Sequence, residues 1–297
     1  AVFSGAKLNN GLINIPIILN DDSSPIYGNY LLGNPYPSAI SATDFIDINN
    51  DYDTNTDNND NVIETLYFWS HNTNQGDGDN DAADYASWNS TGGTAACGGC
   101  TTPNGNIASG QGFFARLNGT KDFKFNNAMR VTGENTTTFF KTKGKKSIVN
   151  PDDKIWLNLT SSNGFSQILL AFMDKATDAV DSNYDGLLFS SAKNISFYSN
   201  LEGEKYTIQG KDLRDTYEEV SLGFDAETTG EFKVSIADIQ GTLVQNNVLL
   251  RDNDLGVVWD LQQGDYIFEN YETGSFTDRF HLLLGETSTQ TTLAVNS

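Results

Sequence analysis

The second half of the chain alternates between apolar and polar residues over short stretches. In Ile155-Trp156-Leu157-Asn158-Leu159-Thr160 and in Phe232-Lys233-Val234-Ser235-Ile236 every second residue is apolar, which is the period of a half-buried β-strand. Other short runs of β-branched and aromatic residues predict strands at 166–172, 195–198, 206–208, 220–224, 248–251, 266–268 and 279–284. No helical period of ten or more residues interrupts them. The pattern predicts an all-β fold, in which antiparallel strands form a two-sheet sandwich of the Ig-like or jelly-roll type.

The first half is organised around two apolar runs that border glycine and proline. They are Tyr30-Leu31-Leu32-Gly33-Asn34-Pro35-Tyr36-Pro37-Ser38-Ala39-Ile40 and Ser109-Gly110-Gln111-Gly112-Phe113-Phe114-Ala115. Each is typical of a buried strand that runs into a tight turn, so we expect them to frame a core, with the Asp- and Asn-rich insert between them outside it. The same reasoning predicts a helical turn capped by Ser or Thr at 41–46, a loop at 92–106, and strands at 12–19, 27–32, 65–69, 85–88, 113–117, 123–125 and 128–131.

A change of composition near Pro151 predicts two domains. With 297 residues the chain is long enough for two units of roughly 150 residues each. We expect two β-sandwich (jelly-roll or Ig-like) domains in tandem, at 1–133 with the acidic loop insert and at 151–285. A polar, lysine-containing connector at 134–150 joins them, and a tail follows at 286–297.

The chain is strongly acidic. Its 39 acidic and 18 basic residues give a net charge of −21, which disfavours binding to nucleic acid and to anionic membranes and attracts cations. Solubility is an equally good reason for this charge. No apolar run approaches the roughly 18 residues of a membrane helix, so membrane insertion is not expected. The opening residues lack a signal-peptide pattern, which is compatible with secretion if a signal has been removed.

One acidic loop resembles a calcium-binding loop in its spacing. In Asp181-Ser182-Asn183-Tyr184-Asp185-Gly186 oxygen-bearing side chains alternate before a glycine, as in the first half of an EF-hand loop. Ala192 stands at position twelve, where a bidentate Glu is expected, so Asp174 or Asp178 would have to complete the shell. The alternative interpretation is an Asx-rich turn between strands.

Two further acidic clusters lie in the insert of the first half. In Asp53-Thr54-Asn55-Thr56-Asp57 oxygens again alternate, Asn58 takes the glycine position, and Glu64 falls at position twelve. The second cluster consists of Asp77, Asp79, Asp81 and Asp84. Calcium is the cofactor that these clusters predict, and two such clusters could share one ion.

The only two cysteines are close together, in Cys97-Gly98-Gly99-Cys100. A zinc site lacks its second pair of ligands, and a thioredoxin-like site would need a helix start after a strand. The prediction is therefore a small local disulfide between Cys97 and Cys100, in an oxidising compartment.

Residues for catalysis are sparse. The chain has two histidines, His71 and His281, and no Gly-x-Ser-x-Gly elbow. His281 alternates with apolar neighbours, so we expect it on the solvent face of a strand. No spacing singles out a carboxylate pair for glycoside hydrolysis. Trp69, Trp88 and Trp156 are expected mainly in the core, although exposed tryptophans would suit sugar stacking.

Seven runs spread along most of residues 5–285 resemble known sequences. They are 32–40, 103–114, 125–130, 157–159, 165–169, 183–186 and 278–280, and they read Leu-Gly-Asn-Pro-Tyr-Pro-Ser-Ala-Ile, Pro-Asn-Gly-Asn-Ile-Ala-Ser-Gly-Gln-Gly-Phe-Phe, Phe-Asn-Asn-Ala-Met-Arg, Leu-Asn-Leu, Phe-Ser-Gln-Ile-Leu, Asn-Tyr-Asp-Gly and Asp-Arg-Phe. In content and order they resemble the C-terminal β-domain module of large cell-surface proteins of the Bacteroidota, of the flavobacterial type, that the type IX secretion system exports.

The resemblance implies a location and a position within a longer protein. Such modules precede a C-terminal sorting domain that is removed on release or attachment, so the chain is expected to be a C-terminal fragment whose tail leads into that domain. The resemblance brings no catalytic residues with it. The cysteine pair and the acidic insert depart from the commoner pattern.

Together these observations predict a non-enzymatic, secreted module, either extracellular or attached to the cell surface. It would act as a stalk, filament or adhesin segment stabilised by calcium, with other surface proteins, copies of itself or polysaccharide as partners. The alternative is a carbohydrate-binding module attached to a secreted polysaccharide hydrolase. A chain that is itself a hydrolase is a third, less favoured interpretation.

Overall fold

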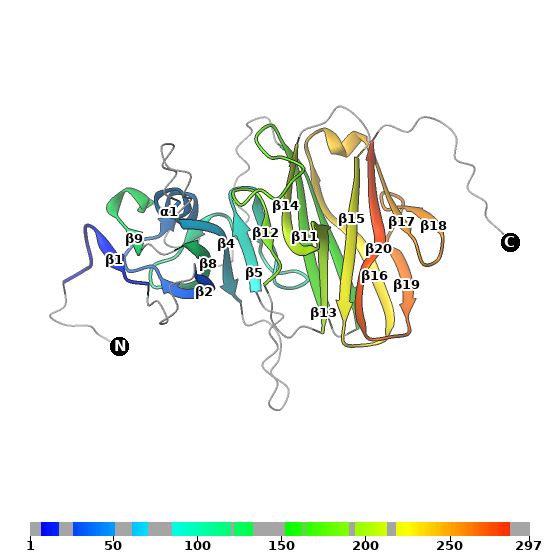
Figure 1. The fold of residues 1–297 in the computed structure, drawn as a ribbon, viewed down its shortest axis with the longest axis horizontal. Helices are drawn as coiled ribbons and strands as arrows, with labels where there is room; N and C mark the ends of the chain where they lie inside the picture. The colour runs from blue at the N-terminus through cyan, green and yellow to red at the C-terminus, as the bar shows by residue number, and fades with distance from the viewer. Residues whose placement is uncertain are drawn as a thin grey trace.

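The computed structural model describes residues 7–17, 26–50, 61–70, 85–119, 122–132, 152–162, 164–189, 194–212 and 218–285. Over these residues the protein is all-β, as the sequence predicts, with one short α-helix (Figure 1). The strands of the two halves lie in separate sheets, side by side along the longest axis of the molecule. The predicted connector and tail lie outside the described residues.

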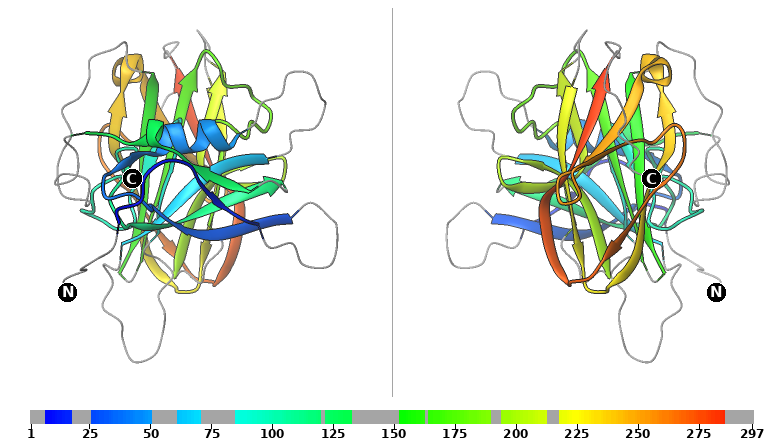
Figure 2. Two further views of the ribbon diagram at one scale, coloured as in Figure 1. Left: turned by 90° about the vertical axis from the view of Figure 1, so that its left-hand side faces the viewer. Right: turned by 90° about the vertical axis from the view of Figure 1, so that its right-hand side faces the viewer.

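The second half forms one large sheet. Eleven strands take part, in the order β18-β17-β20-β15-β13-β14-β11-β10-β16-β19, and β12 pairs with β14 off this path. The sheet curls around a single core into a nearly closed barrel (Figure 2). A short 3-10 helix, η3 (Gly241–Gln245), leads from β16 to β17. The strands are β10 (Asp153–Ser161), β11 (Gly164–Met173), β12 (Gly186–Leu187), β13 (Ile195–Leu201), β14 (Glu204–Asp212), β15 (Glu218–Ala226), β16 (Gly230–Gln240), β17 (Asn247–Asp252), β18 (Val257–Asp260), β19 (Tyr266–Asn270) and β20 (Gly274–Gly285).

One pair in this sheet is parallel, which corrects the expectation of a purely antiparallel arrangement. Leu169 to Met173 of β11 run alongside Ile208 to Asp212 of β14 in the same direction. The chain between them contains β12 and β13 and crosses over before β14 joins the sheet, which is the connection that a parallel pair requires. A period of two in the sequence does not show strand direction.

The core of the second half is aromatic. Phe224, Phe232, Phe268 and Phe280 come from four different strands, and all four are buried. Their rings meet with centroids 5.2 Å apart for Phe268 and Phe280 and 5.7 Å apart for Phe224 and Phe232. In β10, β15 and β20 every second residue belongs to this core, so the alternation seen in the sequence is confirmed there, whereas Tyr206 and Ile208 of β14 are buried outside the cluster.

The first half contains a five-stranded sheet, two two-stranded pairs and the helix. The sheet has the order β2-β8-β4-β5-β6, and the pairs are β1-β9 and β3-β7. The elements are β1 (Ile13–Ile15), β2 (Ile26–Gly33), β3 (Ile40–Ser41), α1 (Ala42–Asn49), β4 (Asn61–Trp69), β5 (Tyr85–Asn89), β6 (Gly92–Thr94), β7 (Asn106–Ile107), β8 (Gly112–Gly119), β9 (Phe123–Phe125) and the 3-10 helix η2 (Asn127–Met129).

The two apolar runs contribute to this core, as predicted, but the stretch between them does not lie wholly outside it, because Leu66 and Phe68 of β4 and Trp88 of β5 are buried in the same cluster. Leu32 of β2 pairs with Phe113 of β8, and both side chains are buried. Asn34 is buried beside them and donates from Nδ2 to the carbonyl oxygens of Ser38 (2.8 Å) and Ile107 (3.0 Å). A buried amide satisfied in this way fixes the turn after β2 against the turn before β8.

Local capping explains both a confirmed and a wrong prediction. The helix α1 begins after Ser41, whose Oγ accepts a hydrogen bond from the backbone N–H of Asp44 at 3.1 Å, as the predicted cap requires. The predicted strand at 128–131 is wrong, because Asn126 accepts from the N–H of Ala128 and starts the 3-10 helix η2 instead. The predicted loop at 92–106 contains the short strands β6 and β7.

The two halves share an extensive interface. Strand β11 is buried on both faces, with Leu170 in the barrel core and Leu169 turned toward the first half. The indole Nε1 of Trp156 donates to the carbonyl of Gly93 at 2.8 Å, and Nζ of Lys154 donates to that of Thr91 at 2.7 Å. Within the described residues we find no helix with the length and apolar character needed to cross a membrane.

Candidate functional site

The predicted calcium loop is a compact turn held by its own carboxylates. The backbone N–H groups of Tyr184 and Asp185 donate to the carbonyl of Asp181, at 2.9 and 2.7 Å. Asp181 Oδ1 accepts from the N–H of Asn183 (3.2 Å), and Asp185 Oδ2 accepts from the N–H of Asp181 (2.7 Å). These are the contacts of an Asx-rich turn, the alternative that the sequence left open.

Asp185 is the buried member of this turn. Only 2% of the residue is exposed, and its other oxygen, Oδ1, accepts from the N–H of Gly210 in β14 at 2.9 Å. Burial raises the pKa of Asp185 from 3.8 to about 7, against the opposing effect of the two N–H donors and of Lys211. The side chain of Asp185 therefore links the turn at 181–185 to strand β14 of the barrel.

Asp178 forms an ion pair with a lysine of β14. Its Oδ1 lies 3.3 Å from Nζ of Lys211, which also lies 3.0 Å from Oε1 of Glu218. Across the part of the chain that the structure describes, no three acidic, histidine or cysteine side chains gather as metal ligands would. The calcium site at Asp178, Asp181, Asn183 and Asp185 stays a prediction.

Glu64 lies on β4, where a register shift between Ile63 and Leu66 marks a bulge. Its Oε2 is 3.4 Å from Nε of Arg116 on β8. Burial raises the pKa of Glu64, and Arg116 opposes that effect. The other predicted ligands of the insert lie outside the described residues: Asp53, Asn55, Asp57, Asp77, Asp79, Asp81 and Asp84.

Cys97 and Cys100 are joined in a disulfide. The bridge lies in the segment after β6, where Gly98 approaches the ring of Phe165 at the start of β11. It closes a loop of the first half beside the interface with the second.

His281 is the histidine that the structure describes, and it takes part in an acid–imidazole pair. It lies half-buried on β20, with Nδ1 2.7 Å from Oε1 of Glu219. Ser221 faces it across the strand pair, but its hydroxyl donates to Oδ1 of Asp278 at 2.9 Å. Glu219 is also paired with Arg251, so the group forms a surface charge network rather than a nucleophile with its base.

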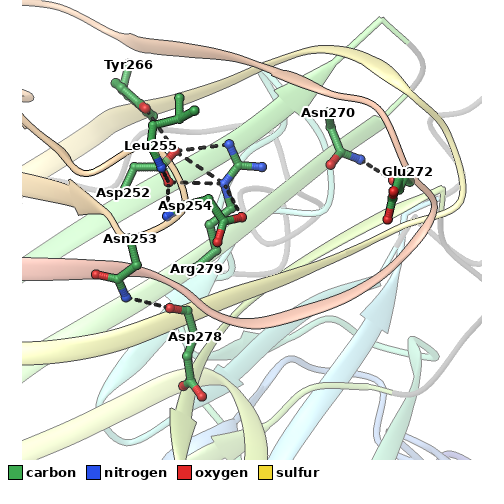
Figure 3. Close-up of polar contacts among 9 residues, drawn as sticks. All are labelled: Asp252, Asn253, Asp254, Leu255, Tyr266, Asn270, Glu272, Asp278 and Arg279. Carbon is green, nitrogen blue, oxygen red and sulfur yellow. Dashed lines mark hydrogen bonds and ion pairs between the residues drawn. The ribbon is translucent and has the colours of Figure 1, made fainter.

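A buried ion pair between β17 and β20 was not predicted as a site. Asp252 is fully buried and Arg279 is 7% exposed, and Nη2 of Arg279 lies 3.0 Å from Oδ2 of Asp252 (Figure 3). The hydroxyl of Tyr266 in β19 donates to the same Oδ2 at 2.9 Å. Asp252 Oδ1 accepts from the N–H groups of Asp254 (2.9 Å) and Leu255 (3.2 Å).

This network closes the barrel where backbone pairing stops. Tyr266 lies on one end strand of the sheet and Asp252 on the strand next to the other end. The guanidinium carbon of Arg279 lies 4.3 Å from the ring centroid of Phe268, so the cation also covers the aromatic core. Each carboxylate oxygen of Asp252 has at least two donors, as a buried charge requires. The run Asp278-Arg279-Phe280 was among the resembling stretches, and that was the only signal in the sequence.

Comparison with known proteins identifies the family of this chain but no activity. No curated protein matches the chain, and no solved structure matches it. One family model, described as "Domain of unknown function (DUF8693)", matches residues 1–284. Because this match covers both halves and almost the whole sequence, the chain belongs to the DUF8693 family.

Proposed function

We propose that this protein is a non-enzymatic structural or adhesive module of a secreted cell-surface protein, as a segment of a stalk, filament or adhesin. The observation that supports it best is the interface that joins the two halves along the longest axis (Figure 1). The carbonyl of Tyr184 accepts from both Asn89 Nδ2 (3.1 Å) and Thr91 Oγ1 (2.7 Å), and the N–H of Ala95 donates to Gln167 Oε1 at 2.7 Å. These bonds, together with the apolar contact of Leu169 beside Gly92, oppose bending between the halves, which suits a part that bears mechanical load.

The disulfide supports a location outside the cytoplasm. Both cysteines of the chain are used in it, and disulfides persist mainly in oxidising compartments. Export by a type IX system and attachment at the surface belong to the same proposal and rest on the resemblance of the sequence.

The finer architecture is also proposed. We regard 1–133 and 151–285 as tandem sandwich-type units joined by 134–150, with the barrel of the second half as a strongly curled form of two facing sheets. In this interpretation the end strands β18 and β19, which are in contact through Trp259 and Tyr266, are the neighbouring edges of two facing sheets.

Calcium stabilisation is tested by melting the protein with EDTA and with added calcium. If the predicted loops bind calcium, millimolar calcium raises the melting temperature and EDTA lowers it, because a ligand that binds only the folded state stabilises it. Magnesium at the same concentration is the control. Equal midpoints in all three conditions would remove stabilising calcium sites from the proposal.

Surface labelling tests the location and the role. Antibodies against the purified chain should label intact cells that produce the natural protein, and external protease should remove the signal. Labelling only after lysis would contradict the proposal. Turnover in a broad screen of polysaccharide, ester and peptide substrates would contradict the non-enzymatic part.

One observation favours the alternative, a carbohydrate-binding module. Trp69 at the end of β4 is 55% exposed, whereas Trp88 is buried and Trp156 is half-buried at the interface. An exposed indole offers a stacking face for a sugar ring. Specific binding on a glycan array that Trp69→Ala abolishes, with unchanged melting, would favour this function over the structural one.

A further inference from the structure

The edge strand β18 exposes apolar side chains on both faces. Val257, Val258 and Trp259 are 41%, 38% and 44% exposed, and Leu255 in the preceding turn is 61% exposed. Ile267 of β19 is 56% exposed, and the contact between Trp259 and Tyr266 brings these two end strands together. Apolar edge strands that nothing covers invite pairing with another strand, and most proteins protect them with charge, proline or a bulge.

The backbone of β18 also has a free side. In the described part of the chain β17 is its only strand partner. The N–H of Leu261 donates to the carbonyl of Val248 at 2.9 Å, and the register pairs Trp259 with Leu250 and Val257 with Asp252. Because hydrogen-bonded and non-bonded pairs alternate along an antiparallel ladder, the N–H and C=O of Val258 and the N–H of Asp260 point away from β17, whereas the C=O of Asp260 accepts from the N–H of Gln263 at 3.1 Å.

The surroundings of this edge are acidic. Asp254 is exposed in the preceding turn, with Oδ2 3.5 Å from Nε of Arg279, while Asp260 ends β18 and Glu269 is exposed on β19. The nearby cations are already paired: Arg251 with Glu219, and Lys233 with Asp265 at 3.0 Å. An incoming strand should therefore carry apolar residues and positive charge.

The chain contains a segment with this chemistry. Residues 136–149 read Thr-Thr-Thr-Phe-Phe-Lys-Thr-Lys-Gly-Lys-Lys-Ser-Ile-Val, with four lysines, no acidic residue, and many residues that favour strands. In a chain of net charge −21 this is an unusually basic stretch. It lies outside the described residues.

We propose that β18 binds residues 136–149 of a second copy of this chain as an added β-strand. A neighbouring copy is favoured over the same copy because the flanking residues lie near the first half: Lys154 bonds to the carbonyl of Thr91, whereas β18 lies at the far end of the barrel (Figure 1). Symmetric pairing of β18 with itself is disfavoured, since it would bring two acidic rims together.

Such a contact is heterologous, because a different surface of each copy takes part. Heterologous contacts that do not close into a ring build an open line of copies. The inference thus names a partner for the structural role proposed above and rests on it. The test below needs no cell, so failure of surface labelling and failure of strand binding are separate results.

A labelled synthetic peptide of residues 136–149 tests the site. The receptor is the full chain with Lys141, Lys143, Lys145 and Lys146 changed to Glu, so that its own segment does not compete. We expect saturable binding by fluorescence anisotropy that weakens as NaCl rises from about 50 to about 500 mM. A peptide with the four lysines changed to Glu should not bind.

Val258→Pro in this receptor is the decisive variant. It removes an outward N–H but no bond to β17, so folding should be retained while peptide affinity falls by about tenfold or more. Val258→Thr keeps the N–H and is the matched control; circular dichroism and melting check the fold of both. Absence of peptide binding, or equal binding by the proline variant, would overturn the proposal.

Sedimentation of the complete chain tests the second copy as the occupant. The wild-type chain should self-associate with rising concentration, and both Val258→Pro and the four-lysine variant should stay monomeric. A wild-type chain that is monomeric at high concentration would overturn the proposal. So would association that Val258→Pro abolishes and the lysine variant retains, because that result indicates symmetric pairing of β18.

Discussion

At the scale of single residues, buried charge is the feature that most strongly constrains this protein. Asp252 of β17 and Arg279 of β20 are buried in the barrel, and Asp185 is buried in the turn that precedes β12. Each carboxylate accepts backbone N–H bonds, and Asp252 has a cation as well. The contribution of such groups to stability depends on keeping every partner.

Loss of Arg279 should destabilise the fold strongly. In Arg279→Met the apolar part of the side chain is kept, but Asp252 is left buried without its cation, at a cost of about 3–5 kcal/mol. Arg251→Met removes an exposed partner of Glu219 and should cost less than about 1 kcal/mol. Urea denaturation measures both. Equal costs would show that burial of Asp252 does not matter.

The raised pKa of Asp185 predicts a pH dependence. Between pH 4 and 7 the folded state holds a proton that the unfolded state has released, so the contribution of Asp185 to stability falls as the pH rises from about 4 to about 7 and changes little above that. The stability of wild type minus that of Asp185→Asn should therefore be larger at pH 5 than at pH 7.5, by about 2 kcal/mol. A difference that does not change with pH would show that Asp185 has an ordinary pKa.

At the scale of elements, the sequence locates strands well and their partners poorly. The alternation in β10 and β16 was read correctly, and these strands do pair with each other, with a bulge between Trp156 and Leu157. The two-residue strands β3, β7 and β12 have no pattern long enough to detect, because they depend on contacts from distant segments. The cap of α1 was visible since it depends only on local residues.

Removal of that cap should weaken the first half. Ser41→Ala leaves the N–H of Asp44 without its acceptor and should cost about 1 kcal/mol. Thr43→Ala, at an exposed position in the first turn of the same helix, is the control and should be nearly neutral. Chemical denaturation of both variants provides the measurement. Equal losses of stability in the two variants would show that the Ser41 cap does not stabilise the helix.

At the scale of the whole molecule, the close contact between the halves depends on glycine. A side chain at Gly92, where φ is +150°, would meet Cδ2 of Leu169 at 2.8 Å. Gly230 also has a positive φ, +122°, but nothing lies within 4 Å of its Cβ position. Substitutions at Gly92 and Gly230 therefore separate the cost of backbone strain from the cost of crowding the interface between the halves.

Gly92→Ala should therefore cost more stability than Gly230→Ala. Both substitutions strain the backbone, and only the first crowds the interface, which adds about 1–3 kcal/mol. Differential scanning calorimetry should also show one transition for wild type, because the halves unfold together. Two transitions in wild type, or equal costs for the two variants, would contradict a tightly coupled interface.

The candidate site illustrates what spacing can and cannot predict. The alternating oxygens at 181–185 predicted a calcium loop, with an Asx-rich turn as the alternative; the structure shows the contacts of the turn, and calcium binding stays a prediction. Whether such oxygens bind an ion or backbone N–H groups depends on Gly210 and Lys211, which lie on another strand. The Asp252–Arg279 pair joins residues 27 positions apart, a separation that no local pattern marks.

Local sequence patterns were enough to predict the all-β class, most strand positions, the cap of α1 and the contribution of residues 32–40 and 109–115 to a core. These follow from side-chain period and local backbone preference, which act over a few residues. The folded structure was needed to show that the strands of the second half form one curled sheet with a parallel pair, and that the halves share a buried interface. Those features depend on which distant strands meet, and the free energy that selects them comes from contacts between segments far apart in the chain.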